Sequence, residues 1–471
     1  MRTVTEKYKL RRYIKLRHQV VGAWWKEDQG QWHLQIRDLE KDEVFSDYAD
    51  FFILGYGIVN FWEWPKIQGL HDFKGPYMHS AAYDESFDAT GKTIALVGGG
   101  SSGIQILPEI RKVAKKVYHY AKTPNWCAPV DFGASELIKR GKIAEGNFNY
   151  SEEEKELGRG ELGHFYVPEG LKFGTEAQAE VFKVFENHMR ERLKTKPEIL
   201  DVMAPYFPPG CRRLTPGPGY LEALCELNVE FISEKISHVE DKGIFTEKSG
   251  LKEVDAIIWA TGFNVDWLER FPTVGRHGRS MTDVMDPDPE AYLGMFVDSL
   301  PNATLIVGPN AAPGGTTAIQ TIETEYEHVV AVLKKLLLQK IKSICVKTNV
   351  VKQYTAQMFS AHKPTIFGQP RNIADGRNVA YYGGNGLNLT VAVRNPRWED
   401  FDYTYLDELE GNPQSWLGNG FVVADVDGSS RVKHLRLENL DIPPVPTDDE
   451  EKPKALAMQN GNKTSANGVT A

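Results

Sequence analysis

The fold is decided by the stretch TIALVGGGSSG, residues 93–103. Its first five residues are apolar or β-branched, which favours a central strand of a parallel sheet. The glycines follow at the spacing G-x-G-x-x-G, and apolar residues then recur at helical spacing over 104–110. A second apolar run at 117–120 predicts the next strand, so the segment predicts one βαβ unit. Pro108 should weaken or kink the helix unless it lies near its start.

The glycine turn is a candidate phosphate-binding site, because a strand leads into it and a helix leads out. Gly98 permits the tight turn, Gly100 lets the backbone approach a pyrophosphate, and Gly103 lets the helix pack close to the sheet. Ser101 and Ser102 begin the helix, whose free N–H groups would face the phosphates. The alternative is a glycine turn in an α/β domain that binds no ligand.

The residues after the second strand favour NADP over NAD. An NAD-binding unit usually carries an acid about 20 residues beyond the glycine turn, where it bonds the ribose 2′-hydroxyl. Here the strand runs into YHYAKT, residues 118–123, without an acid. Lys122, with Thr123 beside it, is available to a 2′-phosphate. The alternative is that Lys122 is a solvated surface lysine.

A second candidate anion site is the pair Arg212 and Arg213, in the Pro- and Gly-rich loop 207–219. Adjacent arginines in a rigid loop suit contacts with phosphate or with an anionic oxygen. A surface basic pair or an internal salt bridge fits the same residues equally well.

The rest of the chain alternates between strand and helix patterns. Residues 20–25 and 32–36 predict a hairpin, and 47–56 predict a buried strand. Residues 175–198 predict an amphipathic helix inside a mostly helical insertion at about 127–208. Further strands are predicted at 229–232, 254–259 and 303–307, and one long helical stretch at 319–345. The polar, Pro-rich residues 441–471 predict a disordered tail.

Composition excludes several classes of protein. The 471 residues carry 25% charged and 41% hydrophobic residues and a net charge of −9. A mildly acidic chain is a poor candidate for nucleic-acid binding, which needs a basic surface. Four scattered cysteines and dispersed histidines predict neither a disulfide framework nor a metal site. No apolar run is long enough to span a membrane and no signal sequence is present, so a cytoplasmic protein is expected.

A longer pattern just before the glycine turn resembles a family fingerprint. Phe73-x-Gly75-x-x-x-His79-x-x-x-Tyr83-Asp84 closely resembles the pattern of Baeyer–Villiger monooxygenases, the class B flavoprotein monooxygenases, with Tyr83 in place of the usual Trp. The stretches DAIIWATGF, GPN and PRWEDF, at 255–263, 308–310 and 396–401, are also similar to segments of that family. The resemblance covers about residues 10–420 and is closest to fungal members tied to secondary-metabolite pathways.

The resemblance implies an α/β fold with two nested Rossmann-like dinucleotide-binding domains, one of FAD type and one of NADP type, and a helical insertion. The segments would be 1–90 for the first part of the FAD domain with a hairpin and linker, 91–262 for the NADP domain, and 263–440 for the rest of the FAD domain and the substrate region. The family begins with a βαβ unit and its own G-x-G-x-x-G turn, which this sequence lacks. We therefore expect the FAD domain to be incomplete at its N-terminus and this chain alone to bind FAD poorly.

The resemblance also implies the chemistry. NADPH would reduce FAD, O2 would add to give a C4a-peroxyflavin, and a ketone would become an ester or lactone. Arg213 matches the active-site arginine that steadies the developing oxyanion, and Arg212 and Lys122 match cations near NADP. Flavin contacts are expected around Gly57, Thr261, Gly262, Gly308 and Asn310. The Gly- and Asn-rich residues 368–386 depart from the family pattern.

Two other functions remain open at the level of sequence. One is a catalytically inactive NADP-binding remnant or interaction protein, to which the missing first glycine turn points. The other is a flavin enzyme that oxygenates nitrogen or sulfur, since such enzymes share most of these motifs. Asp84 in the fingerprint favours the Baeyer–Villiger type.

Overall fold

The computed structural model describes residues 2–129, 151–153, 168–205, 207–211, 214–265, 267, 270–314, 318–368, 378–406, 412–421 and 425. The chain divides into two units, residues 1–413 and 414–471. In the second unit the described residues form the end of a 3-10 turn, Pro413–Leu417. The predicted tail 441–471 lies outside the described residues, so its disorder stays a prediction.

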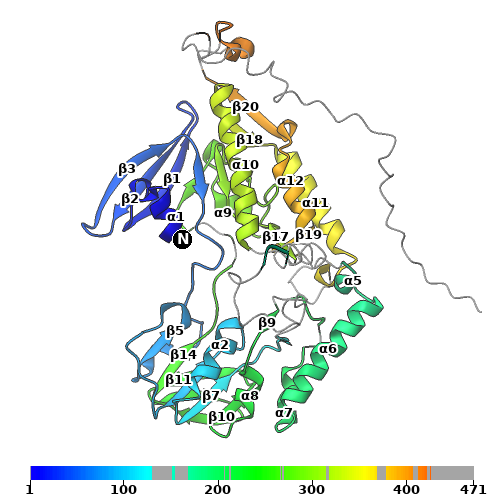
Figure 1. Ribbon diagram of the computed structural model, residues 1–471. Helices are drawn as coiled ribbons and strands as arrows, with labels where there is room; N and C mark the ends of the chain where they lie inside the picture. The colour runs from blue at the N-terminus through cyan, green and yellow to red at the C-terminus, as the bar shows by residue number, and fades with distance from the viewer. Residues whose placement is uncertain are drawn as a thin grey trace, which may run out of the picture. The chain divides into compact units, whose positions relative to one another are not determined.

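The largest sheet among the described residues is a five-stranded parallel sheet (Figure 1). Its strand order is β10-β7-β6-β14-β5, and each neighbouring pair is parallel. The strands are β5 (Tyr77–His79), β6 (Thr93–Val97), β7 (Lys116–Tyr120), β10 (Val229–Ile232) and β14 (Ala256–Trp259). The sheet takes β5 from the segment that precedes residue 91.

The predicted βαβ unit is confirmed. Strand β6 leads into helix α2 (Ser101–Ile110), and β7 returns parallel to β6 with Ile94 opposite Val117. Pro108 lies in the last turn of α2, where it is buried, and the helix ends two residues later. Pro108 therefore does not lie near the helix start; it has no N–H to donate to the Ile104 carbonyl, which is consistent with the helix ending soon after it.

The two faces of this sheet are covered differently, because alternate side chains of a strand point to opposite faces. Ile94 and Leu96 pack in one cluster with residues of α2 and of α8 (Tyr220–Cys225). Ala95 and Val97 pack in another cluster with the antiparallel strands β11 (Ile236–Glu240) and β12 (Gly243–Thr246). Strand β13 (Gly250–Glu253) completes that three-stranded sheet.

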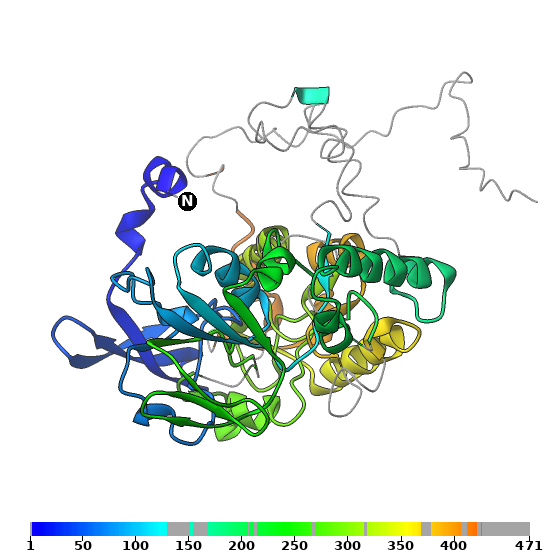
Figure 2. The ribbon, with the colours of Figure 1, turned by 90° about the horizontal axis from the view of Figure 1, so that it is seen from below.

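The described part of the predicted insertion is mostly helical. It contains α5 (Pro168–Leu171), α6 (Glu176–Arg192) and α7 (Pro197–Met203), and strand β8 (Cys127–Ala128), which pairs in parallel with β9 (Thr215–Pro216) beyond the insertion. The predicted helix at 175–198 is confirmed over α6 but ends at Arg192, and α7 begins separately at Pro197; the Thr175 hydroxyl caps α6 by accepting the Gln178 N–H. Helix α6 contacts α8 beside the sheet, as Figures 1 and 2 show.

The N-terminal hairpin is also confirmed. Strands β1 (His18–Lys26) and β2 (Gln31–Asp38) are antiparallel, and β3 (Glu43–Ala49) and β15 (Thr273–Val274) complete their sheet. Before the hairpin, α1 (Arg2–Lys7) buries none of its residues and stands away from the sheet in Figure 2.

The prediction of one strand over residues 47–56 is wrong. The chain leaves the hairpin sheet after Ala49, and β4 (Phe52–Leu54) pairs instead with the parallel strand β16 (Ala303–Leu305). The Asn302 side chain bonds the Asp50 carbonyl at 2.9 Å, and the Phe52 N–H bonds the Asn302 carbonyl at 2.8 Å. Because of these long-range bonds, the chain changes from one sheet to another within residues 47–56, although the local sequence pattern shows no break there.

The prediction of a continuous helix over 319–345 is wrong at its C-terminal end. Helix α10 (Ala318–Leu338) stops, Lys340 takes a left-handed φ of 53°, and strand β18 (Ile341–Val346) follows. Strand β18 pairs with β20 (Phe401–Tyr405), so its apolar residues are buried in a sheet. Helices α9 (Met281–Met285), α11 (Thr348–His362) and α12 (Gly386–Arg394) and the parallel strands β17 (Ala312–Gly314) and β19 (Tyr381–Asn385) complete this region.

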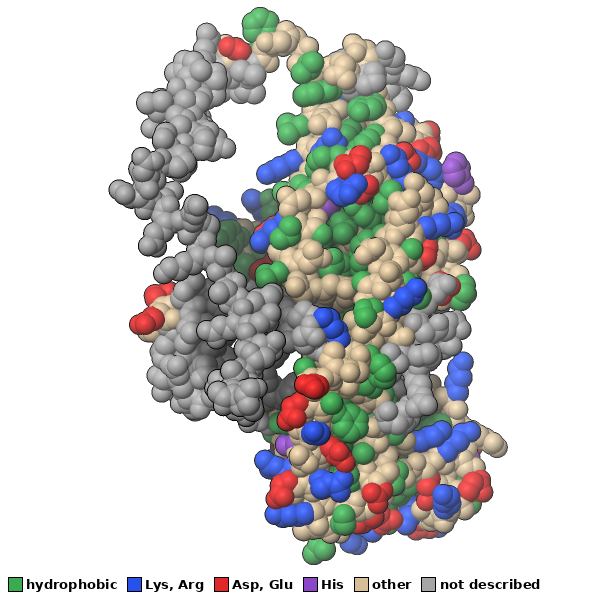
Figure 3. Space-filling model, turned by 90° about the vertical axis from the view of Figure 1, so that its right-hand side faces the viewer, with side chains coloured by type: hydrophobic (Ala, Val, Ile, Leu, Met, Phe, Trp, Pro, Cys, Tyr) green, Lys and Arg blue, Asp and Glu red, His purple; other side chains and the backbone are tan. Residues whose placement is uncertain are grey.

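Helices α10 and α12 are in contact, and an ion pair between Glu327 and Arg394 joins them. Figure 3 shows green apolar side chains among charged ones in the upper part of this face, and Val330 and Val391 of the two helices are exposed. Among the described residues, no helix combines the length and the hydrophobicity needed to cross a membrane.

Candidate functional site

The glycine turn adopts the geometry that a dinucleotide-binding turn needs. Gly98 has a φ of 126°, and a Cβ there would lie 2.1 Å from the carbonyl oxygen of Ala260, the residue that follows β14. A Cβ on Gly103 would lie 1.8 Å from the Gly98 carbonyl oxygen, so α2 packs directly against the turn. These two positions therefore accept only glycine.

Space is open in front of α2, at the place where a phosphate would lie. Gly100 is the N-cap, and a Cβ built on it meets nothing within 4 Å. The first bond inside the helix joins Ile104 N–H to Gly100 O, which leaves the preceding N–H groups without helical partners. The Ser101 hydroxyl is bonded to the Thr215 hydroxyl at 2.8 Å, which ties the start of the helix to β9. The turn fits a pyrophosphate.

Lys122 and Thr123 are both exposed just beyond the end of β7. The Ala121 N–H bonds the Ile232 carbonyl, so the backbone remains in the sheet up to the residue before Lys122. Lys122 therefore lies at the carboxyl edge of the sheet, on the strand next to the glycine turn. Arg212 and Arg213, predicted to add a second cation and the catalytic arginine, lie outside the described residues.

The fingerprint residues divide between buried and exposed positions. Phe73 is buried in the cluster beneath the sheet, and a Cβ on Gly75 would lie 2.7 Å from the Asp255 carbonyl oxygen. Tyr83 is 41% exposed, and Asp84 accepts hydrogen bonds from the backbone and the hydroxyl of Ser86. Those hydrogen bonds lower the pKa of Asp84.

His79 is the buried centre of the fingerprint. Its ring stacks on Trp62 with centroids 4.4 Å apart, and Nδ1 accepts the Ala81 N–H at 3.1 Å. Burial lowers the pKa of His79, and the backbone of Gly262 raises it in part. His79 also lies opposite Trp259 in the β5–β14 pair, so the structure brings the fingerprint and the ATG segment together.

Two chain segments cross side by side between the five-stranded sheet and the β4–β16 pair. The Asn264 N–H bonds the Phe61 carbonyl at 2.8 Å, and the Arg270 guanidinium lies 4.8 Å from the centre of the Phe61 ring. One segment follows β4, and the other follows the ATG residues, where Thr261 is exposed and Gly262 has a φ of 90°. The two predicted dinucleotide sites are therefore joined by this crossing.

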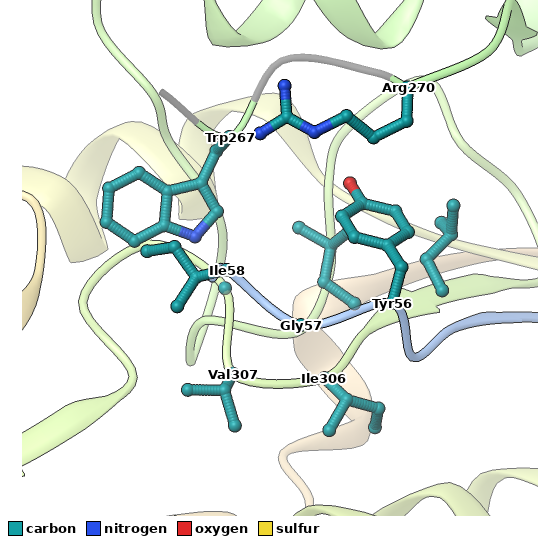
Figure 4. Close-up of a pocket in the computed structure, with 10 residues that line it drawn as sticks. Tyr56, Gly57, Ile58, Trp267, Arg270, Ile306 and Val307 are labelled. Carbon is teal, nitrogen blue, oxygen red and sulfur yellow. The ribbon is translucent and has the colours of Figure 1, made fainter. Parts of the chain in front are cut away.

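A small pocket opens at the carboxyl ends of β4 and β16 (Figure 4). Residues from both strand ends and from the returning segment line it: Leu54, Tyr56, Gly57, Ile58, Trp267, Arg270, Leu305, Ile306, Val307 and Gly308. Figure 4 shows the Tyr56 ring reaching toward the Arg270 guanidinium. Ligands of open parallel sheets bind at this edge.

Two of the residues predicted to contact a flavin, Gly57 and Gly308, line this pocket. Gly57 has a φ of 74°, and a Cβ there would meet nothing within 4 Å, so its backbone is approachable. Trp267 is 8% exposed, and its indole N–H has no hydrogen-bond partner among the described residues. The Asn310 amide donates to the carbonyls of Asn378 and Tyr381 at 2.8 and 2.7 Å. Asn310 thus holds its own loop in place.

Sequence reasoning missed three residues of this pocket region. Trp267 and Arg270 lie in an irregular segment whose neighbours along the chain give no pattern. Glu325 of α10 is only 1% exposed and accepts the Val307 N–H at 2.8 Å. A signal for Glu325 does exist, since it falls at helical spacing with the buried residues Val329, Val332 and Leu336.

The family model described as flavin-binding monooxygenase-like matches residues 1–131. The FAD-binding monooxygenase tazF of Aspergillus terreus is 32% identical over 437 residues, which are 88% of this chain and 76% of that protein. A Baeyer-Villiger monooxygenase of Pseudomonas aeruginosa is 31% identical over 356 residues, 74% of this chain and 65% of that protein.

Solved structures resemble the fold closely. Cyclohexanone monooxygenase from Rhodococcus sp. Phi1 bound to NADP+ matches with a TM-score of 0.70 and 22% identity, over 86% of this chain and 83% of that one. An oxidized steroid monooxygenase bound to NADP matches with a TM-score of 0.70 and 21% identity, over 86% and 84%. This likeness confirms the predicted α/β fold class with Rossmann-like dinucleotide-binding domains.

Proposed function

Because the chain belongs to the flavin-binding monooxygenase-like family, we propose that it is an FAD- and NADPH-dependent monooxygenase that inserts one oxygen atom of O2 into a ketone. The product would be an ester or a lactone. The observation that carries this proposal is the crossing at Phe61, which contacts Asn264 and Arg270 and joins the glycine turn to the pocket at Gly57 and Gly308. The proposed reaction needs an NADPH site and a flavin site in the same unit, because NADPH reduces the flavin.

The NADP site would be built by this chain as follows. The N–H groups at the start of α2 bind the pyrophosphate, and Gly100 lets it approach the backbone. Lys122 pairs with the 2′-phosphate, which distinguishes NADPH from NADH. No residue between 118 and 123 is an acid, so the end of this strand itself places no like charge beside that phosphate.

Bound FAD would supply electron transfer and the activation of O2. The pocket wall from Tyr56 to Ile58 and from Ile306 to Gly308 orients one part of it and excludes water there. The indole N–H of Trp267, which has no partner among the described residues, could donate to a ligand oxygen or nitrogen. Arg213 would hold the negative charge that develops on oxygen, with a planar fork of donors.

The substrate and the setting are proposed from the relatives. One relative carries the name Baeyer-Villiger monooxygenase, and cyclohexanone monooxygenase shares the fold. The similarity to the FAD-binding monooxygenase tazF of Aspergillus terreus, together with the resemblance of the sequence to fungal members of the family, supports a role in fungal secondary-metabolite biosynthesis, for example of a polyketide. The fingerprint with Asp84 favours a ketone over a nitrogen or sulfur substrate.

The test is an oxygenation assay with labelled gas. Because weak FAD binding is expected, the purified chain is mixed with FAD in large excess, with NADPH and with a panel of cyclic and linear ketones under 18O2, and products are analysed by mass spectrometry. We expect one 18O atom in an ester or lactone, dependent on NADPH. A matched panel of amines and sulfides serves as control. Labelled N-oxides or sulfoxides without labelled esters would contradict the ketone assignment. NADPH binding without any oxygenation would contradict the proposed monooxygenase activity.

A further inference from the structure

Val307 has a backbone conformation that is unusual for its residue type. It lies two residues after the end of β16, in the pocket wall, with a φ of 57°. A β-branched side chain in the left-handed region is unfavourable and persists only where the surroundings hold it. The question is therefore what holds this peptide.

Three hydrogen bonds hold the neighbouring peptides, and they come from other backbone segments. Ile306 N–H bonds the Leu54 carbonyl, Leu305 N–H bonds the Met295 carbonyl, and Gly308 N–H bonds the Gly294 carbonyl. The Val307 N–H differs, because its partner is a side chain. It donates to Oε2 of Glu325, at 2.8 Å, from helix α10 behind the wall.

We propose that Glu325 is a positioning residue that fixes the left-handed Val307 peptide and thereby the shape of this pocket wall. The buried carboxyl group of Glu325 accepts the Val307 N–H, and Val307 is one of the residues that line the pocket. Loss of the acceptor would leave a buried N–H unpaired and the strained turn unsupported. The link to flavin binding rests on the proposed function, whereas the positioning role does not.

The surroundings of Glu325 favour its neutral form. The described residues provide no cation that pairs with it, and its Oε1 has no hydrogen-bond partner among them. His328 lies one turn further along α10, with Nδ1 bonded to the Val393 carbonyl at 2.6 Å. Tyr354 of α11 is close enough to interact electrostatically, and α12 contributes only Gly386, Leu389, Thr390 and Val393 to the small pocket beside Glu325.

Burial in these surroundings raises the pKa of Glu325 to about 8, against the lowering effect of the Val307 hydrogen bond. A neutral carboxyl group accepts the Val307 N–H without bringing a charge into the core. Ionisation above this pH places an unpaired charge there, which is unfavourable in a buried site. The carboxylate is the stronger acceptor for the Val307 N–H, but the buried charge lowers the stability of the surrounding fold, so protection of this segment should fall as the pH rises.

Hydrogen–deuterium exchange of peptides covering residues 303–310 tests the positioning role directly. Glu325→Leu should speed exchange of the Val307 amide by about tenfold or more, whereas Glu325→Gln, which keeps an acceptor, should leave it protected. Glu323→Leu is the matched control, because Glu323 is exposed on the same helix. Equal protection in Glu325→Leu and wild type would overturn the proposal.

A pH series keeps the test decisive if Glu325→Leu does not fold. After correction for intrinsic exchange rates, the Val307 amide of the wild type should lose protection above about pH 8, and Glu325→Gln should not. An identical pH response in both proteins would contradict the role of Glu325. FAD titration of the same variants separates the two proposals. Loss of amide protection with unchanged FAD affinity would retain the positioning role and reject the flavin assignment of this pocket.

Discussion

His119 of β7 and Tyr220 of α8 are joined by a hydrogen bond of 2.9 Å between Nε2 and the phenol oxygen, although both side chains are completely buried. The other ring nitrogen, Nδ1, lies 3.2 Å from the Leu96 carbonyl oxygen. A neutral imidazole satisfies both contacts, since Nδ1–H donates to Leu96 and Nε2 accepts the Tyr220 hydroxyl. Burial lowers the pKa of His119 to about 4.

This arrangement predicts acid sensitivity. The unfolded His119 takes up a proton near pH 6.5 and the folded one only near pH 4, so its contribution is complete above 6.5 and is lost as the pH falls toward 4. The loss amounts to about 3 kcal/mol. In urea unfolding, the stability gap between wild type and His119→Phe/Tyr220→Phe should shrink over this range. The control is His18→Gln, a change at an exposed histidine, for which the difference in stability from wild type should stay constant over this range. A constant difference between wild type and the double variant would refute the prediction.

Glu325 predicts the opposite dependence. Its folded pKa of about 8 lies above the ordinary 4.5, so its contribution is complete below pH 4.5 and is lost as the pH rises through 8. The loss is up to about 4–5 kcal/mol. Glu325→Gln should therefore be more stable than wild type at pH 8.5 and show little advantage at pH 5. Glu323→Gln is the control, and a parallel pH profile for wild type and Glu325→Gln would show that Glu325 is ionised in the fold.

The glycine turn predicts two different outcomes for the same chemical change. Gly103→Ala places a methyl group 1.8 Å from a carbonyl oxygen and should destabilise the protein by about 1–3 kcal/mol or more. Gly100→Ala meets open space and should cost about 1 kcal/mol or less, yet its methyl group would occupy the phosphate position. Thermal unfolding and NADPH titration measure the two effects. Full NADPH affinity in a stable Gly100→Ala would place the phosphates elsewhere.

Lys122→Ala should weaken NADPH binding by about 1.5–3 kcal/mol, the value of a charge-assisted contact, and leave NADH binding unchanged. Lys115→Ala is the matched control, an exposed lysine just before the same strand. Fluorescence titration of both cofactors against all three proteins gives the comparison. Equal affinity of the wild type for NADPH and NADH would reject the assignment.

Arg213→Lys should keep NADPH consumption but lower ester formation by about 10²–10³-fold, because an ammonium cannot make the same bidentate contact with a developing oxyanion. Arg190→Lys, an exposed arginine paired with Glu186 on α6, should behave as wild type. The measurement is the ratio of product formed to NADPH consumed. Retention of the wild-type ratio in Arg213→Lys would show that another residue performs this role.

The sequence predicts this fold best where periodicity and turn chemistry act over a few residues. The unit from β6 to β7 follows from TIALV, three glycines and the helical spacing of Ile104, Leu107 and Ile110, all of which are local signals. The break after Ala49 and the end of α10 at Leu338 depend on distant partners. Asn302 and strand β20 supply those partners, and no window around the breaks contains them.

The same distinction applies to the site. Gly98, Gly100 and Gly103 are predictable because a short turn determines their neighbours. Trp267 reaches the pocket only through the path of an irregular segment, and Glu325 acts on a peptide 18 residues earlier in the chain. Helical spacing reveals that Glu325 is buried, but only the tertiary structure shows that Val307 is the group it serves.

The hydrogen bond between Asn264 and Phe61 also makes the chain modular. Residues 62–263 form one continuous segment, and the two ends of this segment meet at the Asn264–Phe61 hydrogen bond. A stretch whose ends meet can be cut out and replaced as a cassette, because each junction needs only a short splice. Phe173 and Cys211 bond the carbonyls of Pro364 and Ile366, and Phe367 packs in the same core cluster as Cys211, so 364–367 would have to travel with it. Among the described residues, nicotinamide preference could thus be exchanged between relatives with two splices at the crossing and one short replacement at 364–367.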